Sequence, residues 1–219
     1  GGKASKGMGL VFDVGHAREE EIPVVLVPLI MLTTWMSHLF GGSVGREGVA
    51  VQIGATLSHR FARHIKIADA SRIFLMTGMA AGFAGLFQTP LAATFFALEV
   101  LTVGELQLIA LYPALIASIV ASFTSHALGL EKFAVPLKET LSWTPETLIK
   151  VALLGLAFGL AGKLFAVSLS WLKKTVAQVL PNPYIRIAVI GAGLSLVLLT
   201  LQLTKVGIYS GLGTNLIDL

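Results

Sequence analysis

Apolar runs separated by short polar or glycine-rich breaks make up most of this chain. In a bilayer the backbone must satisfy its own hydrogen bonds, so a long apolar run predicts a helix that spans the membrane. We therefore expect an all-α integral membrane protein with several spans. The pattern predicts helices over residues 23–40, 47–62, 70–87, 91–101, 105–125, 145–172 and 184–203.

The predicted spans differ in length, and the shortest ones follow two breaks. A complete crossing takes about 20 residues, whereas the helices after Gly48 and after Pro90 are shorter. The breaks are the glycine-rich stretch 41–48 and the sequence Gln-Thr-Pro at 88–90. Helix ends are tolerated at membrane depth only inside protein or beside an aqueous cavity, and in transporters they mark the substrate site. We expect broken or re-entrant helices at both places.

The composition supports a membrane protein. Hydrophobic residues make up 55% and charged residues 13% of the 219 residues, against about 25% charged residues in soluble domains. The net charge is +4, and basic residues cluster between apolar runs, at Arg60–Lys66 and Lys173–Lys174, which predicts cytoplasmic loops and no nucleic-acid partner. The chain has no cysteine, and we expect no cofactor and no metal site. Both ends read like the interior of a longer protein, so we expect one partial transmembrane domain over residues 1–219.

The stretch Gly45-Arg46-Glu47-Gly48 places charges beside a helix start in this apolar chain. The first N–H groups of a helix have no partner within it and form an anion site. Glu47 is a tethered anion at that site, which it occupies when ionised and leaves when protonated. A purely structural role fits equally well, because acidic residues stabilise helix starts and Gly41 and Gly45 suit helix packing. The cost of an ionisable residue in a span, roughly 2.5–3.5 kcal/mol, favours a functional role.

Three motifs in order resemble the CLC family of chloride channels and transporters. Gly45–Gly48 followed by Val51–Gly54 is similar to its G-(K/R)-E-G-P…V-Q-G signature. GLFQTPLAATFFALEV at Gly85–Val100 resembles its N-A-P-L-A-G…F-x-x-E-E segment, and Gly7–Leu10 stands where it carries G-S-G-I-P. The resemblance covers most of the chain. It implies the first inverted repeat without its first helices, the start of the second repeat, and a homodimer paired through the span 106–120.

The resemblance also implies roles for individual residues. Glu47 is expected to gate the anion path and to carry the proton, and no catalytic residue is implied. Arg46 either raises the local positive potential or braces the turn, and bracing is favoured. Glu99 is a possible second polar site, with a buried structural carboxylate as the alternative. The anion-binding residues implied are Gly7, Met8, Gly9, Leu10, Arg46, Gly48 and Val49.

Three departures from the family pattern carry information. Met8 replaces a serine whose hydroxyl helps coordinate the anion, and a thioether donates no hydrogen bond. The family's bacterial fluoride-exporting clade typically has methionine there, although methionine is also a common packing residue. Val49 replaces the proline after the gate, which is helpful to a helix start but not required. Val100 stands where exchangers carry an inner proton glutamate, which the fluoride clade lacks and a channel does not need.

The favoured function is antiport of fluoride, or chloride, against protons across a bacterial cytoplasmic membrane. The first alternative is a chloride channel or chloride/proton exchanger of the same fold, in which Met8 is incidental. A remote alternative is a membrane enzyme acting on a lipid phosphate, with His38 or His64 as base, but the sequence shows no nucleophile paired with either. A non-transporting scaffold would leave Glu47 without a purpose.

Overall fold

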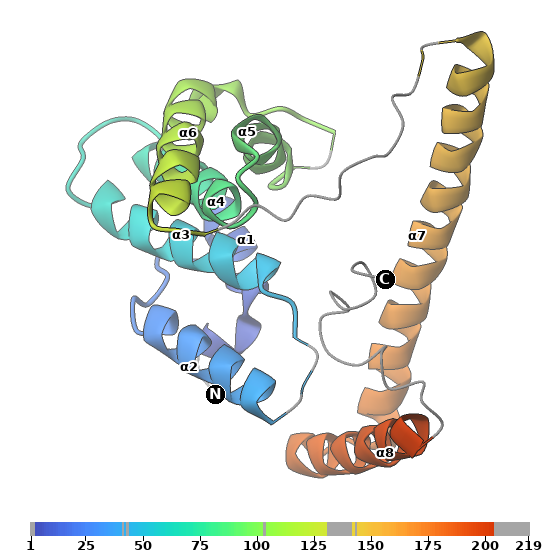
Figure 1. Cartoon of the computed structure of the whole chain (residues 1–219). Coiled ribbons are helices and arrows are strands. Elements are labelled where there is room, and N and C mark those ends of the chain that lie inside the picture. The colour runs from blue at the N-terminus through green and yellow to red at the C-terminus, as the bar shows by residue number, and fades with distance from the viewer. Residues whose placement is uncertain are drawn as a thin grey trace. The chain divides into compact units, whose positions relative to one another are not determined.

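The regular structure of the chain is helical, as expected (Figure 1). The computed structural model describes residues 3–40, 42, 44–102, 104–130, 142 and 144–203, and the following elements lie within these ranges. The α-helices are α1 (Met8–Gly15), α2 (Leu26–Leu39), α3 (Glu47–Ala62), α4 (Ala70–Phe87), α5 (Pro90–Glu99), α6 (Leu111–Ala127), α7 (Pro145–Val179) and α8 (Pro183–Leu203), and the short 3-10 helices are η1 (Lys3–Lys6) and η2 (Leu108–Ala110).

Helix α1 is absent from the elements that the apolar pattern predicts. It has only eight residues, and Asp13 and the polar residues after it read as a loop. Its buried positions, Leu10, Val11 and Val14, lie on one face and join the core with Leu75 of α4. Tertiary packing therefore stabilises a helix that is too short to be stable alone.

Two other elements differ from the expected ranges. Helix α6 begins at Leu111 and not at 105, and residues 105–107 are not helical. Gly104, just before them, has a φ of +83°, which a helix does not accommodate. Helix α7 continues past Lys173 and Lys174 to Val179. Lysine is a good helix former whose long side chain keeps its charge in a polar environment, so the pair does not end the helix.

Helix α4 is the centre of the first of two compact units, which spans Gly1–Ala134. It contacts α1, α3, α5 and α6 (Figure 1). Its closest approach is to α3, where a Cβ atom added to Gly78 would overlap the carbonyl oxygen of Gly54, and one added to Gly82 would overlap that of Ala50. Glycine on both helices therefore brings the two backbones together, as is common between membrane helices.

A buried histidine connects three segments at one end of this unit. His59, on the last turn of α3, is 3% exposed. Its Nε2 atom lies 3.3 Å from the carbonyl oxygen of Glu20, in the α1–α2 loop, and its Nδ1 atom lies 3.2 Å from the hydroxyl of Ser71 on α4. Arg63 at the end of α3 also pairs with Glu21, with 2.5 Å between Nη2 and Oε2. The α1–α2 loop is thus held against the ends of α3 and α4.

The second unit, Val135–Leu219, contains α7 and α8 in its described part. Thr144 caps α7 by accepting a hydrogen bond from the N–H of Thr147, and Pro145 occupies the first turn, where it leaves no donor unpaired. Arg186 closes the turn between the two helices by donating from Nε to the carbonyl of Leu180. The boundary between the two units follows Ala134, and the prediction of one partial domain over 1–219 stays a prediction.

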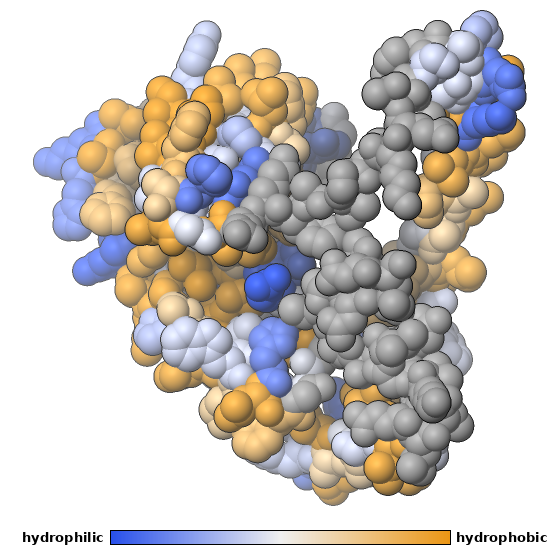
Figure 2. Space-filling model, viewed as in Figure 1, coloured by the Kyte–Doolittle hydropathy of each residue, from blue (hydrophilic) through white to orange (hydrophobic). Residues whose placement is uncertain are grey.

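Four helices in the described part are long and apolar enough to cross a membrane. They are Ala70–Phe87, Leu108–Ala127, Pro145–Val179 and Pro183–Thr200, and two shorter apolar helices, Leu26–Leu39 and Pro90–Glu99, accompany them. Apolar side chains cover much of the visible surface, with smaller hydrophilic patches between them (Figure 2). The chain is therefore an integral, multi-pass membrane protein.

Candidate functional site

The glycine break leads directly into α3, whose first turn is open to an anion. Arg46 is the N-cap residue and makes no side-chain cap, and its carbonyl accepts the N–H of Ala50 at 3.0 Å. The N–H groups of Gly48 and Val49 have no backbone acceptor within the described part of the chain. Because Val49 stands where the family has proline, this turn keeps an N–H donor that proline would lack.

The start of α1 is a second open helix end. Gly7, its N-cap residue, has a φ of +54°, a left-handed conformation that glycine adopts without steric cost. The N–H of Leu10 donates to the Gly7 carbonyl at 3.1 Å, and the Leu10 side chain is fully buried. The prediction that Leu10 binds the anion stays a prediction, and its N–H already has this backbone acceptor. The free donors are the N–H groups of Met8 and Gly9, which have no backbone acceptor among the described residues.

The structure brings these two helix starts together. A Cβ atom added to Gly48 would lie 3.7 Å from Cγ of Met8, which is van der Waals contact. Met8 packs against the hydrophobic core of the unit. Residues 40 positions apart in the sequence thus bring the positive ends of two helices to one place, which is the arrangement that stabilises an anion.

The carboxylate of Glu47 folds back over the glycine turn. A Cβ atom added to Gly45 would lie 2.5 Å from Oε2 of Glu47, so the absence of a side chain at Gly45 makes room for the carboxylate. Glu47 is exposed and makes no ion pair or side-chain hydrogen bond with the described residues. The carboxylate is therefore free to move relative to the helix end.

The neighbouring cations do not neutralise Glu47 in the described part of the chain. Arg46 is exposed and forms no ion pair there. Lys6, which precedes Gly7, pairs with Asp13 at 2.8 Å and with Glu19 at 3.1 Å. Hydrogen bonds from Lys3 and Lys6 lower the pKa of the Glu19 carboxyl group. This network fixes η1 against α1 and leaves the site to backbone donors.

Glu99 is the last residue of α5. It is exposed and makes no ion pair with the described residues, and its role as a second polar site or a structural carboxylate stays a prediction. Val100, its neighbour, is partly buried and packs against the core.

Two buried polar atoms lack a hydrogen-bond partner in the described part, and the sequence predictions give Gln52 no site role of its own. Gln52 is 5% exposed, and its Nε2 atom has no hydrogen-bond partner in the described part; the same holds for the buried Nε2 atom of His38. Gln52 lies one turn after Gly48 on the same face of α3. A buried donor without an acceptor costs about 1–3 kcal/mol, which is a signal of a polar ligand or water. In the sequence, the signal for Gln52 is a polar residue inside the apolar run after Gly48.

Comparison with known proteins identifies the family of this chain. A family model described as "Voltage gated chloride channel" matches residues 2–219, nearly the whole chain. The chain belongs to the voltage-gated chloride channel (CLC) family. This confirms the resemblance that the three sequence motifs carry, and with it the all-α membrane fold.

Individual CLC proteins differ in how closely they match. A "Chloride/fluoride channel protein" of Pseudomonas syringae pv. tomato is 38% identical over 161 residues, which cover 73% of this chain and 36% of the relative. The "Voltage-gated ClC-type chloride channel ClcB" of Salmonella typhimurium is 30% identical over 162 residues, 74% of this chain and 35% of the relative. The chain thus spans about a third of the length of these curated relatives.

A solved structure matches the whole chain. The "Crystal structure of a CLC-type fluoride/proton antiporter" has a TM-score of 0.88 and 50% sequence identity, covering 99% of this chain and 54% of that one. The bacterial relatives and the apolar helices of this CLC chain agree with the predicted location in the bacterial cytoplasmic membrane. The roles of Glu47, Met8 and the other site residues stay predictions.

Proposed function

We propose that the protein carrying this chain exchanges fluoride for protons across the membrane, with Glu47 as gate and proton carrier. The position of Met8 opposite Gly48 carries the proposal, because a Cβ atom added to Gly48 would lie 3.7 Å from Cγ of Met8, and this supports two open helix starts acting as one anion site. The helix ends supply the four N–H groups of Met8, Gly9, Gly48 and Val49. Two glycines among these donors let an anion approach the backbone closely.

The proposed mechanism is a competition between two anions for one site. When ionised, the Glu47 carboxylate swings from its place over Gly45 to the N–H groups of α3, where it closes the path. When protonated, it loses its attraction to the helix end, and the site is free for the transported anion. The proton enters and leaves on Glu47, so anion movement in one direction is coupled to proton movement in the other.

Met8 supports fluoride as the transported ion. A serine hydroxyl at this position would donate to the anion, whereas the thioether of Met8 cannot. The remaining donors are backbone N–H groups, which are compact enough for a small, strongly hydrated anion. The resemblance to the fluoride/proton antiporter, at 50% identity, and to the chloride/fluoride channel protein supports the same choice.

Transport is proposed here in preference to catalysis, because CLC family members are channels and transporters. A base for the lipid-phosphate alternative would be His38 or His64. The Nε2 atom of His38 is buried without a partner in the described part, and no described hydrogen bond joins His64 to a nucleophile. Neither histidine is paired as a general base requires.

A homodimer is the proposed assembly, paired through the exposed face of α6. Tyr112, Ile116, Ile119, Val120 and Phe123 lie on one stripe of this helix, and each is at least 36% exposed. The opposite stripe, with Ala114 and Ser118, is buried against the unit. A second copy would cover the exposed stripe within the bilayer.

A chloride channel or chloride/proton exchanger is the second candidate. The ClcB relatives favour it, since they are named chloride channels and are about 30% identical to this chain. In this case Met8 fills space in the core and does not set selectivity.

Anion efflux from liposomes that contain the complete protein distinguishes the candidates. Fluoride and chloride efflux are compared side by side while proton uptake is recorded. We expect fluoride efflux to exceed chloride efflux at least tenfold, with protons moving in the opposite direction. Chloride efflux equal to or faster than fluoride efflux would contradict the proposal and favour the chloride candidate.

A further inference from the structure

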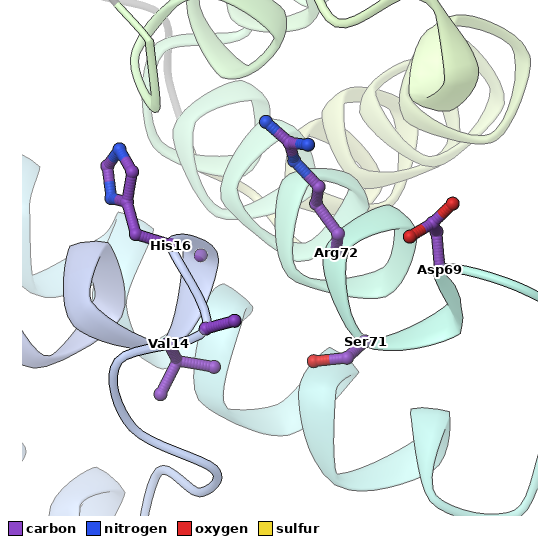
Figure 3. A pocket seen from close by; sticks show the side chains of 7 residues that line it. Val14, His16, Asp69, Ser71 and Arg72 are labelled. Carbon is purple, nitrogen blue, oxygen red and sulfur yellow. The ribbon is translucent and has the colours of Figure 1, made fainter.

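A cavity of about 410 Å³ lies between the end of α1 and the start of α4, at the opposite end of α1 from the anion site (Figure 3). Cavities of about 300–1,000 Å³ hold small ligands, and this one is far larger than a halide ion needs. Its lining combines a polar side and an apolar side. It consists of Val14, Gly15, His16, Ala17, Asp69, Ser71 and Arg72.

Arg72 is a cation without a counter-ion in this cavity. It is partly buried, and its Nε atom is fully buried without a hydrogen-bond partner in the described part of the chain. The ion pairs of that part involve Lys3, Lys6, Arg63 and Lys150, and none involves Arg72. A buried N–H donor without an acceptor is costly. The Nε atom of this arginine therefore favours an acceptor that the described residues do not provide.

The other polar side chains leave room for such an acceptor. His16 donates from Nδ1 to the carbonyl of Phe12 at 2.8 Å, so its Nε2 atom remains for a ligand. That atom accepts from a phosphate hydroxyl or, in the imidazolium form, donates to a phosphate oxygen. Asp69 also lines the cavity, on the other side of Arg72 from His16 and Val14 (Figure 3). The hydroxyl of Ser71 already forms a hydrogen bond with Nδ1 of His59, at 3.2 Å.

Backbone donors at the same place add to the positive potential. Asp69, the N-cap residue of α4, has a φ of 56° and provides no side-chain cap. Its carbonyl accepts the N–H of Ile73 at 2.9 Å, and the N–H groups of Ser71 and Arg72 have no backbone acceptor among the described residues. An arginine, a histidine and two free N–H groups thus surround one cavity.

We propose that this cavity binds a phosphate group, either as inorganic phosphate or as the headgroup of an anionic lipid. The guanidinium group matches the geometry of phosphate oxygens through paired N–H donors. The site is independent of the proposed transport function, because none of its residues belongs to the anion site at Met8 and Gly48.

Binding of radiolabelled inorganic phosphate to the complete protein in phosphatidylcholine nanodiscs tests the proposal. We expect saturable binding that Arg72→Gln weakens at least tenfold. Arg60→Gln, which changes an exposed arginine nearby on α3, is the matched control and should alter affinity less than twofold. His16→Gln provides a second variant in case Arg72→Gln fails to fold, and we expect a loss of threefold or more.

The source of the phosphate group is found by repeating the measurement with phosphatidylglycerol in the nanodiscs. If the lipid headgroup is the natural ligand, phosphatidylglycerol displaces inorganic phosphate and stays bound to the wild type, but not to Arg72→Gln, in native mass spectrometry. If free phosphate is the ligand, its binding is unchanged by the lipid. Absence of saturable binding in both lipids, or equal losses in Arg72→Gln and Arg60→Gln, would overturn the proposal.

Discussion

Met8 is the residue at which the proposed selectivity is decided, because its side chain replaces a hydroxyl donor with a thioether. Its Cγ atom would lie 3.7 Å from a Cβ atom added to Gly48 at the start of α3, and the side chain packs against the core. The sequence identifies this substitution but not its neighbour, since the contact joins residues 40 positions apart. The fold alone brings them together.

Replacing Met8 with serine tests this residue. Met8→Ser adds one O–H donor at the anion site, so we expect the preference for fluoride over chloride to fall about tenfold, which corresponds to about 1.4 kcal/mol. The measurement is the ratio of fluoride to chloride efflux from liposomes. The control is Met8→Leu, which adds no hydrogen-bond donor at the same position. Met79→Ser is unsuitable as a control because Met79 is fully buried in the core. An unchanged ratio in Met8→Ser would mean that Met8 only fills space.

The ion pair of Glu21 and Arg63 gives a prediction about pH. A hydrogen bond from Arg63 lowers the pKa of the Glu21 carboxyl group below its usual value near 4.3. A carboxyl group whose pKa is lowered by folding contributes stability above the unfolded value, and this stability is lost as the pH falls through the folded value. The pair is exposed, so its contribution is small and salt-dependent.

We therefore expect Glu21→Gln to lower the melting temperature in detergent by about one or two degrees at pH 7. The difference from the wild type should shrink as the pH is lowered from the usual glutamate pKa through the lower folded pKa, because the wild type then also loses the charge. The same scan at high salt should reduce the difference at pH 7. A difference that grows on acidification would show that another group is responsible.

At the scale of elements, the contact between α3 and α4 sets the position of the site, since α3 carries Glu47 and α4 holds it in place. Both helices begin and end where glycine or polar residues interrupt apolar sequence, which is why periodicity and breaks indicate them. Helix α1 gives no such signal, because eight residues with polar neighbours resemble a loop. The N–H groups of Met8 and Gly9 belong to this short helix, so only the structure reveals them.

A matched pair of substitutions on α4 tests the close contact. Gly78→Ala would place a Cβ atom against the Gly54 carbonyl, so we expect a loss of about 1–3 kcal/mol in the free energy of unfolding. Gly85→Ala, where the nearest atom is 4.0 Å away, should be neutral or stabilise by roughly 0.5–1 kcal/mol, as alanine does in an open helix position. Thermal or denaturant unfolding in detergent measures both. Equal stability of the two variants would contradict the close packing.

At the scale of the whole molecule, many large hydrophobic side chains of the described part are exposed and can contact lipid or another protein. No residue of α7 is buried within the described part, and α6 presents its stripe outward. The sequence indicates these helices from their hydropathy, but hydropathy does not separate a lipid-facing stripe from a subunit contact. That separation requires a measurement of assembly.

The proposed dimer predicts a specific effect of a bulky residue on α6. Ile116→Trp adds volume at the centre of the stripe, so we expect the complete protein to shift from dimer to monomer in size-exclusion chromatography with light scattering. Ile149→Trp, an exposed position on α7, is the control and should leave the dimer intact. A monomeric wild type, or dimers in both variants, would contradict pairing through this stripe.

Proton uptake by the Glu47→Gln variant tests the central claim most directly. Glutamine keeps the size of the side chain but cannot ionise or carry a proton. In liposomes with an outward fluoride gradient, the wild type should take up protons in a fixed ratio to fluoride efflux. We predict that the Glu47→Gln variant shows no coupled proton uptake, whether or not fluoride still leaks. Coupled uptake at the wild-type ratio in this variant would contradict Glu47 as gate and proton carrier.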